Sequence, residues 1–589
     1  MLALFFGAVY LLTPTALYYW DGVVFATLCE TGSLHDMIHP HHLLFNFSSD
    51  ILYELVRMHA PGARALSILI VLSSIFGALT IYFSHLIFRR IFNREGLAVA
   101  TTSFMGFSFT FWHYSTDANA YIISAFFPVL ASYLLLTMDN FPMHRFRLTW
   151  VSIVFSIGML LHQVVVLFYP VYFFWMVVFK FRDKSRKFTI PMRILLIILP
   201  ALIAGSVYFL IGRIFFQYTT LDEYWNWITS YGHQKRWWFG NENAGFPAFT
   251  RAVIVSHLKL MFYPDYIRHG FLNFTQLTFV DIVKKLLTVV SLITVLLVFI
   301  RGFVYLIGAI GKRRFYAALL LLWILPYLVF FTFFTPQFEF YRLYYLFPLM
   351  VIFALGLKGF FEKPSFEELD LPIHPNKLSG WVFILLMVFG IYNYALGISP
   401  GMKEENNPWL MEARLFISIA PADSIMVVPF SDEKMEEYSR TANLVKYFGT
   451  QDVLFAKQHD EFVGPVLELV GPPDPSKIDI EPVYWDKVSL RDDMQLDIEK
   501  MLFHEALLDG RKDGWRIIKY IFPDTQIPLE GFVRLPKLSD CEPLLIGNTR
   551  YLPGRRYFKV PEKINYRFPA GFQPKYFEYY EHPERESTE

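Results

Sequence analysis

The chain has 589 residues, of which 54% are hydrophobic, 19% aromatic and only 18% charged, whereas soluble domains carry about 25% charged residues. Its formal net charge of +1 gives no electrostatic basis for binding nucleic acid. The composition therefore excludes an ordinary soluble protein and a nucleic-acid-binding protein, and it predicts a protein integrated in the lipid bilayer.

Apolar runs, each long enough to cross about 30 Å of hydrocarbon as a helix, recur as far as residue 398. They predict a mainly α fold, a polytopic transmembrane helical bundle of about eleven spans. The predicted spans are 1–19, 64–87, 96–112, 120–138, 148–161, 163–179, 190–212, 283–310, 315–334, 343–360 and 379–398. The fifth and sixth are short, and a single bent hairpin is the alternative for that stretch. Residues 1–19 lack the basic leader and cleavage site of a signal peptide and are expected to be the first span itself.

Lysine and arginine are distributed unequally between alternate loops. The basic loops contain Arg89, Arg90 and Arg94; Arg145 and Arg147; Lys180, Arg182, Lys184, Arg186 and Lys187; and Lys312, Arg313 and Arg314. Because basic residues are enriched in cytoplasmic loops, the amino terminus is predicted to be cytoplasmic. The outer side, periplasm or lumen, then holds the loops 20–63, 113–119, 213–282 and 335–342 and everything after the last span.

The segment 400–589 is charged and contains no span, so the predicted division is a transmembrane domain over 1–399 and an extramembrane domain over 400–589. A small α/β domain is expected, with strands at Ser424–Phe430 and Asp452–Ala456 and helices over 432–448 and 493–509. This segment contains no glycine-rich phosphate loop, so nucleotide binding is not predicted for it. Whether Cys29 and Cys541 form a disulfide stays open.

Candidate site residues gather in the predicted outer loops. The first loop contains Asp21, Glu30, His39 and His41. Asp21 is either a functional carboxylate at the membrane boundary or the cap of the following helix. The histidine spacing matches no ordinary zinc pattern, so the histidines are expected to hydrogen bond an anionic or hydroxylic ligand or to shape the loop.

The shorter outer loops contribute further polar side chains. Asp117, Asn119 and Tyr121 are expected to line a cavity, although an interfacial aromatic belt with a helix cap also explains part of this loop. His162 stands alone at its turn, where an interhelical hydrogen bond is the simpler explanation. Glu339 and Arg342 either pair with each other, or Arg342 binds a phosphate with its guanidinium fork.

A first span that ends in Tyr19-Trp20-Asp21-Gly22, followed by an outer loop with the His39-Pro40 element, resembles the GT-C superfamily of membrane glycosyltransferases. Phe107–Trp112, closing on Tyr121, is similar to a run found in the protein O-mannosyltransferase-like branch. The resemblance covers about residues 1–400 and is greatest over 15–125. It departs at Gly22, where relatives often carry glutamate, and at Asn119, where they often carry an acidic residue, so a second carboxylate and a divalent metal are both left open.

The resemblance implies an inverting glycosyltransferase of hexosyl or mannosyl type. It would move a sugar from a polyprenyl-phosphate donor to a hydroxyl of a protein, lipid or glycan at the outer face, with Asp21 as the catalytic carboxylate. Arg342 is the candidate cation for the donor phosphate, and a bacterial inner membrane is favoured over the endoplasmic reticulum. The alternatives are a transporter or flippase for a lipid-linked or small solute, and a catalytically inactive membrane scaffold.

Overall fold

The computed structural model describes residues 1–407 apart from short gaps, and beyond them a helix, six strands and a few neighbouring residues. The gaps are 33–36, 138–143, 179–189, 231–237, 239–245, 264–278, 313 and 362–379. The chain divides into two compact units, Met1–Met402 and Lys403–Glu589. Each unit is described by itself.

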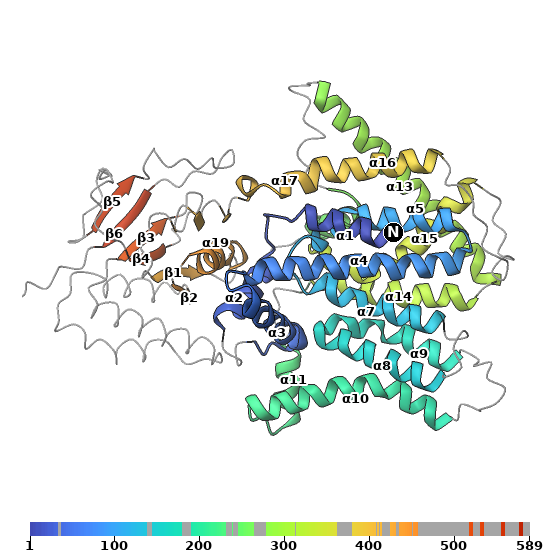
Figure 1. Ribbon diagram of the computed structural model, residues 1–589, viewed down its shortest axis with the longest axis horizontal. Helices are drawn as coiled ribbons and strands as arrows, with labels where there is room; N and C mark the ends of the chain where they lie inside the picture. The colour runs from blue at the N-terminus through green and yellow to red at the C-terminus, as the bar shows by residue number, and fades with distance from the viewer. Residues whose placement is uncertain are drawn as a thin grey trace, which may run out of the picture. The chain divides into compact units, whose positions relative to one another are not determined.

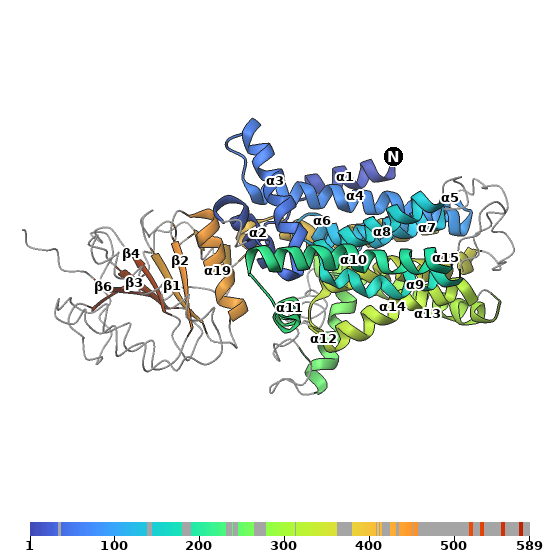
Figure 2. The same ribbon diagram turned by 90° about the horizontal axis from the view of Figure 1, so that it is seen from below.

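The first unit is built from helices that run side by side (Figures 1 and 2). Its longer helices are α1 (Leu2–Leu12), α2 (Trp20–Thr31), α3 (Leu43–His59), α4 (Ala65–Phe92), α5 (Glu95–Phe107), α6 (Phe109–Ser115), α7 (Tyr121–Leu136), α8 (His144–Leu161), α9 (Tyr169–Val178), α10 (Ile190–Phe215), α11 (Leu221–Ile228), α12 (Phe246–Met261), α13 (Phe279–Lys312), α14 (Arg314–Phe333), α15 (Leu343–Phe361) and α16 (Gly380–Asn393). Short helical turns of this unit are η1 (Pro40–His42), η3 (Gln163–Phe168), η6 (Glu339–Arg342), η7 (Tyr394–Ile398) and α17 (Ser399–Gly401), whereas η8 (Glu404–Asn406) belongs to the second unit.

Within the described residues, six helical segments are long and apolar enough to cross a membrane. They are Ala65–Phe92, Ile190–Phe215, Ile282–Gly308, Phe315–Phe333, Glu339–Lys358 and Gly380–Gly401. On the segment Ile282–Gly308, large apolar side chains such as Leu286, Ile293 and Val304 are more than half exposed. Such a surface is stable in lipid and not in water, so the protein is an integral membrane protein. The expected total of about eleven spans stays a prediction.

Two predicted spans are interrupted by breaks in the helix. The expected span 1–19 is not one continuous helix, because α1 ends at Leu12 and residues 13–19 connect it to α2. Pro14 lacks an N–H group and disfavours the helical conformation in the residue before it, which accounts for the end of α1. The expected span 96–112 is likewise divided at Ser108, which has extended backbone angles between α5 and α6.

Glycines allow two of the long helices to touch. A β-carbon at Gly302 of α13 would lie 2.0 Å from the carbonyl oxygen of Ile352 of α15, and one at Gly356 of α15 would lie 1.9 Å from the carbonyl oxygen of Val298. Only glycine permits backbones to approach this closely, as is common where helices pack inside membranes. The two helices therefore form a backbone-to-backbone contact in the bundle.

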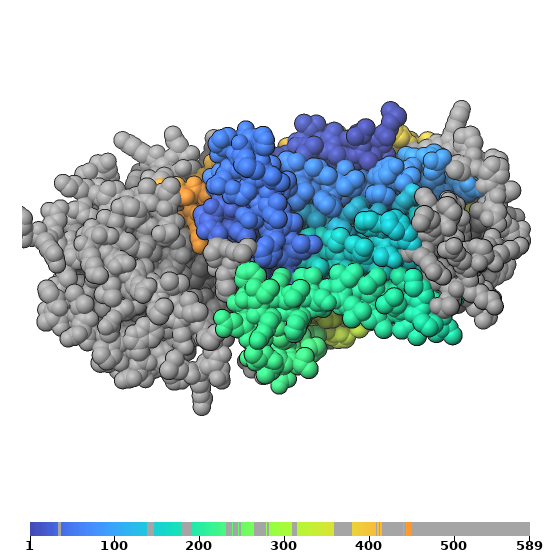
Figure 3. Space-filling view, turned by 60° about the horizontal axis from the view of Figure 1, so that its bottom comes forward, coloured from blue at the N-terminus to red at the C-terminus, as the bar shows by residue number. Residues whose placement is uncertain are grey.

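The loop that carries the histidines packs on α8 and α10. Ile38 and Leu43, on either side of η1, belong to one hydrophobic cluster with Leu160 and Tyr208. The Tyr208 hydroxyl donates a 2.6 Å hydrogen bond to the carbonyl oxygen of Pro40. Figure 3 shows the green surface of α10 and α11 next to the blue surface of the amino-terminal segments. The position of the loop is thus fixed by helices that are far from it in sequence.

The second unit contains a six-stranded sheet with the order β2-β1-β4-β3-β6-β5. The strands are β1 (Ile425–Phe430), β2 (Asp452–Lys457), β3 (Ile517–Ile521), β4 (Glu530–Arg534), β5 (Arg555–Lys559) and β6 (Tyr576–Tyr580). Strands β1 and β2 are parallel and are joined through α19 (Met435–Phe448), and the other pairs are antiparallel. The helix expected over 493–509 lies outside the described residues, and the wider α/β domain stays a prediction.

Candidate active site

Asp21 lies in the first turn of α2, next to the beginning of α7. One of its carboxylate oxygens, Oδ2, accepts a hydrogen bond of 2.5 Å from the hydroxyl of Tyr121. Tyr19, rather than Asp21, is the N-cap residue of α2, which argues against the helix-cap explanation of Asp21. Because the amino-terminal end of a helix carries partial positive charge, the position favours the ionised carboxylate.

The segment that leads to Asp21 is held by the loop between α6 and α7. Asp117 is fully buried. Its Oδ2 accepts the backbone N–H of Tyr19, and its Oδ1 accepts the backbone N–H of Ala118, both at 2.8 Å. The N–H of Thr15 donates to the carbonyl oxygen of Thr116 at 3.0 Å. Burial raises the pKa of Asp117 to about 7, against the opposing effect of the two N–H donors. Asp117 thus anchors the backbone two residues before Asp21.

Gly22 and Asn119, the two positions at which the sequence departs from the GT-C pattern, lie where the start of α2 meets the loop between α6 and α7. A β-carbon at Gly22 would lie 2.0 Å from the carbonyl oxygen of Ala118, so no side chain fits there as the backbone stands. The Asn119 amide donates to the carbonyl oxygens of Tyr114 and Asp117, and its oxygen accepts the N–H of Ile122. Asn119 therefore stabilises the turn into α7 through backbone contacts, and a role in substrate binding stays a prediction.

Histidine side chains from two distant segments meet beside Tyr121. The ring centroids of His42 and His162 are 4.6 Å apart in an edge-on arrangement, and that of His162 is 5.3 Å from Tyr121. His39 is 5.5 Å from His41 and 5.7 Å from His42. Burial lowers the pKa of His39 to about 4, that of His162 to about 3 and that of His42 well below its usual range, so these rings are neutral at neutral pH.

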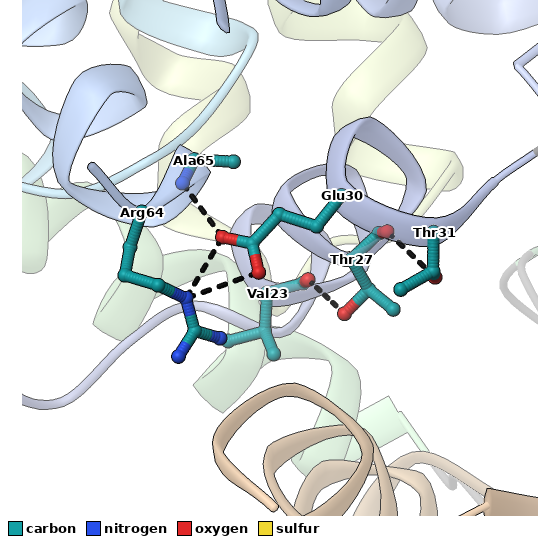
Figure 4. A network of polar contacts seen from close by, with 6 residues as sticks. All are labelled: Val23, Thr27, Glu30, Thr31, Arg64 and Ala65. Carbon is teal, nitrogen blue, oxygen red and sulfur yellow. Dashed lines mark hydrogen bonds and ion pairs between the residues drawn. The ribbon is translucent and has the colours of Figure 1, made fainter. Parts of the chain in front are cut away.

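Glu30 lies at the other end of α2, about 14 Å along the helix from Asp21. Figure 4 shows its carboxylate against Arg64 and Ala65. The Nε of Arg64 is 3.0 Å from both carboxylate oxygens, and the N–H of Ala65 donates to Oε1 at 2.7 Å. These contacts connect α2 to the start of α4. They give Glu30 a structural role, and its predicted role in substrate binding is not tested.

The loop 335–342 reaches the same region through aromatic contacts. The Phe340 ring stacks on Tyr121 at 4.0 Å between centroids and lies 5.1 Å from Tyr19. The ion pair recorded for Glu339 is with Lys259 of α12, at 3.6 Å, and not with Arg342. Of the two alternatives for this loop, the ion pair between Glu339 and Arg342 is not formed, because Glu339 pairs with Lys259 from the long loop 213–282.

Arg342 is fully buried. Its Nη2 donates to the hydroxyl of Ser256 and to the carbonyl oxygens of Phe331 and Pro336, at 2.9 to 3.2 Å. Its Nε and Nη1 have no hydrogen-bond partner among the described residues. A buried cation with unused donors is costly unless an anion or a polar ligand contacts it, which makes Arg342 a candidate for binding a negatively charged group.

The sequence predictions considered the clustered histidines of the first loop, His42 among them, but did not indicate that His42 meets His162. They missed Lys259 and Ser256. His42 stands directly after His41, and its position next to His162 depends on the packing of η1 against α8 and α10. Lys259 and Ser256 are on α12, more than 75 residues before Glu339 in the sequence, and no local pattern indicates that they meet η6.

The residues around Asp21 do not form an obvious metal site. Among the described side chains, no group of three or more His, Cys, Asp or Glu residues is placed to hold a metal ion. The nearest relevant positions, Gly22 and Asn119, supply no carboxylate. We therefore derive no catalytic step through a metal.

Comparison with known proteins supports the fold. No family model and no curated protein sequence matches the chain. The crystal structure of ArnT from Cupriavidus metallidurans bound to undecaprenyl phosphate is similar, with a TM-score of 0.51 and 11% identity over 91% of this chain and 97% of that chain.

The Archaeoglobus fulgidus oligosaccharyltransferase, solved with zinc and sulfate, gives a TM-score of 0.39 and 15% identity. That match covers 75% of this chain and 58% of the oligosaccharyltransferase, so this chain spans less than two thirds of its length. The similarity to ArnT shows that the two proteins share their overall fold.

Proposed function

We propose that the protein is a glycosyltransferase that moves a sugar from a polyprenyl-phosphate donor to an acceptor hydroxyl, with inversion at the anomeric carbon. The observation that carries the proposal is the Asp21 carboxylate, hydrogen bonded to Tyr121 and anchored through Asp117 at the point where α2 and α7 begin. The shared fold with ArnT, which was solved with undecaprenyl phosphate, supports the class of donor.

Asp21 acts as the general base in this mechanism. Its carboxylate takes the proton of the acceptor hydroxyl while that oxygen attacks the anomeric carbon of the sugar. The bond between the anomeric carbon and the phosphate oxygen breaks as the new glycosidic bond forms, and polyprenyl phosphate leaves with the electron pair. A positioned base contributes about 10²- to 10⁴-fold to such a reaction. The Tyr121 hydroxyl donates to the other side of the carboxylate and keeps it oriented.

Arg342 and Lys259 are the candidates that bind the donor phosphate. Arg342 has two buried N–H-bearing nitrogens without a partner in the described part of the chain, and Lys259 lies at η6 through its ion pair with Glu339. Cations near the leaving phosphate stabilise the charge that develops there. A guanidinium is the better group for this purpose because its planar fork matches two phosphate oxygens.

The finer assignments follow from the sequence resemblance. We propose a hexosyl donor, as in the protein O-mannosyltransferase-like branch, and an active site on the outer side of the membrane with a cytoplasmic amino terminus. The acceptor is a hydroxyl of a protein, a lipid or a glycan. A bacterial inner membrane is the proposed location.

The test is the near-isosteric variant Asp21→Asn, with Glu30→Gln as the matched control on the same helix. Asparagine keeps the size of the side chain and removes its basicity. Transfer from undecaprenyl-phosphate-linked hexoses should fall at least about 100-fold in Asp21→Asn, while donor binding and expression stay normal. Glu30→Gln should stay within a few-fold of wild type. Transfer near the wild-type level in well-expressed Asp21→Asn would refute Asp21 as the base.

A further inference from the structure

The imidazoles of His42 and His162 present one unused nitrogen each. His42 is 8% exposed and His162 is 2% exposed. The Nδ1 of His42 and the Nε2 of His162 are buried and have no hydrogen-bond partner among the residues that the structure describes. A buried polar atom without a hydrogen-bond partner is unfavourable, so a pair of such atoms in adjacent rings is suited to bind a polar ligand group.

The other nitrogen of each ring fixes its tautomer. The backbone N–H of Val164 donates to Nδ1 of His162 at 3.2 Å, so Nδ1 carries no proton and Nε2 of this neutral ring is an N–H donor. His42 makes its backbone hydrogen bond with Leu161. A carbonyl oxygen only accepts, so the bonded nitrogen is protonated and Nδ1 of His42 is a hydrogen-bond acceptor. The two unused atoms are therefore one donor and one acceptor.

We propose that His42 and His162 together bind one hydroxyl group of the donor sugar, which selects an uncharged, hydroxyl-bearing sugar ring. This inference rests on the proposed function and adds the substrate class. A hydroxyl is at once a donor and an acceptor, so it receives the N–H of His162 and donates to Nδ1 of His42. Both contacts form without a change in the protonation of either ring.

Charged groups match this pair poorly. A phosphate or carboxylate only accepts hydrogen bonds, so it would satisfy His162 but face the lone pair of His42. An ammonium group only donates, so it would satisfy His42 but face the N–H of His162. Protonating His42 to bind an anion would place a positive charge among the rings of His39, His41 and His162, each of which opposes it. The pair is thus selective for a neutral hydroxyl.

The position of the pair suits the sugar of the donor. Tyr121 contacts Asp21 through its hydroxyl and both histidines through its ring, with centroids 6.3 Å from His42 and 5.3 Å from His162. One aromatic side chain therefore separates the proposed base from the proposed sugar contact. His162 lies between α8 and η3.

The test measures how much the sugar adds to donor binding. Dissociation constants of the full-length protein in detergent are determined for undecaprenyl phosphate and for undecaprenyl-phosphate-linked mannose, glucose and galactose. The sugar preference is the dissociation constant of undecaprenyl phosphate divided by that of the hexose-linked lipid. In His42→Phe, which keeps a planar ring and removes both nitrogens, the preference for the hexose that binds best should fall about ten-fold. In His42→Asn, whose amide oxygen provides a hydrogen-bond acceptor near the position of Nδ1, most of the sugar preference should remain.

The matched control is His59→Phe, at an exposed histidine on α3, which should keep the wild-type preference. An unchanged preference in His42→Phe overturns the proposal, and so does an equal loss of affinity for both lipids, which indicates a structural role for the ring. If the wild-type protein binds neither lipid, the proposed function itself fails. Rescue by asparagine together with normal binding of undecaprenyl phosphate supports the hydroxyl contact.

Discussion

Replacing Asp117 by asparagine should change how the stability of the protein depends on pH. The pKa of buried Asp117 is raised from 3.8 to about 7, so the folded protein holds a proton that the unfolded chain releases. Its contribution to the free energy of unfolding is full below about pH 3.8 and is lost as the pH rises through about 7. At about 1.4 kcal/mol for each pKa unit, the loss between pH 5 and pH 8 is about 2 to 3 kcal/mol. Asparagine does not titrate, so Asp117→Asn should lack this loss.

The assay is thermal unfolding in detergent, followed by intrinsic tryptophan fluorescence between pH 5 and pH 8. The apparent Tm of wild type should fall relative to that of Asp117→Asn as the pH rises. All histidines titrate in both proteins, so the difference between the two curves isolates Asp117. Parallel curves would refute the reasoning, because they would mean that Asp117 is already ionised in the folded protein at pH 5.

Three further predictions concern the site and its orientation. Gly22→Ala forces the Ala118 carbonyl to move and should lower the rate of sugar transfer at least about ten-fold. The control Gly205→Ala, at a position where nothing lies within 4 Å of the added β-carbon, should keep the wild-type rate. Equal activities of the two variants would contradict the tight contact at Gly22. Arg342→Lys should weaken undecaprenyl phosphate binding about ten-fold in a binding titration, since an ammonium lacks the planar fork, and unchanged affinity would remove Arg342 from the phosphate site. In intact cells an impermeant maleimide should label Gln337→Cys and not Arg90→Cys, and the reverse pattern would invert the proposed orientation.

The course of the long helices could be predicted from the sequence, but their interruptions could not. The predicted span 190–212 is α10 (Ile190–Phe215), because an uninterrupted apolar run has few alternatives to a helix in lipid. The break after Leu12 was missed because hydropathy averages over a window, and the apolar flanks hide the polar residues Thr13 and Thr15. Their hydroxyls donate hydrogen bonds to backbone carbonyls instead of water. The free-energy cost of burying these two polar side chains is therefore small.

The site could be predicted only as a set of loops. Asp21 and Tyr121 were both expected to matter, yet their hydrogen bond joins residues one hundred positions apart, and spacing does not indicate such a contact. One of the two alternatives paired Glu339 with Arg342, three residues away, where helical neighbours often pair. The pairing with Lys259 depends on α12 packing against η6, which is a property of the tertiary fold.

The close approach of Gly22 to Ala118 has a consequence for the evolution of this lineage. While the loop 116–119 stays where it is, glutamate cannot replace Gly22, because its β-carbon alone would collide with the Ala118 carbonyl oxygen. Moving that loop would break the hydrogen bonds by which Asp117 holds Tyr19 and Ala118. A substitution at Gly22 alone therefore cannot place a second carboxylate next to Asp21. An acidic side chain at this position requires several neighbouring positions to change together.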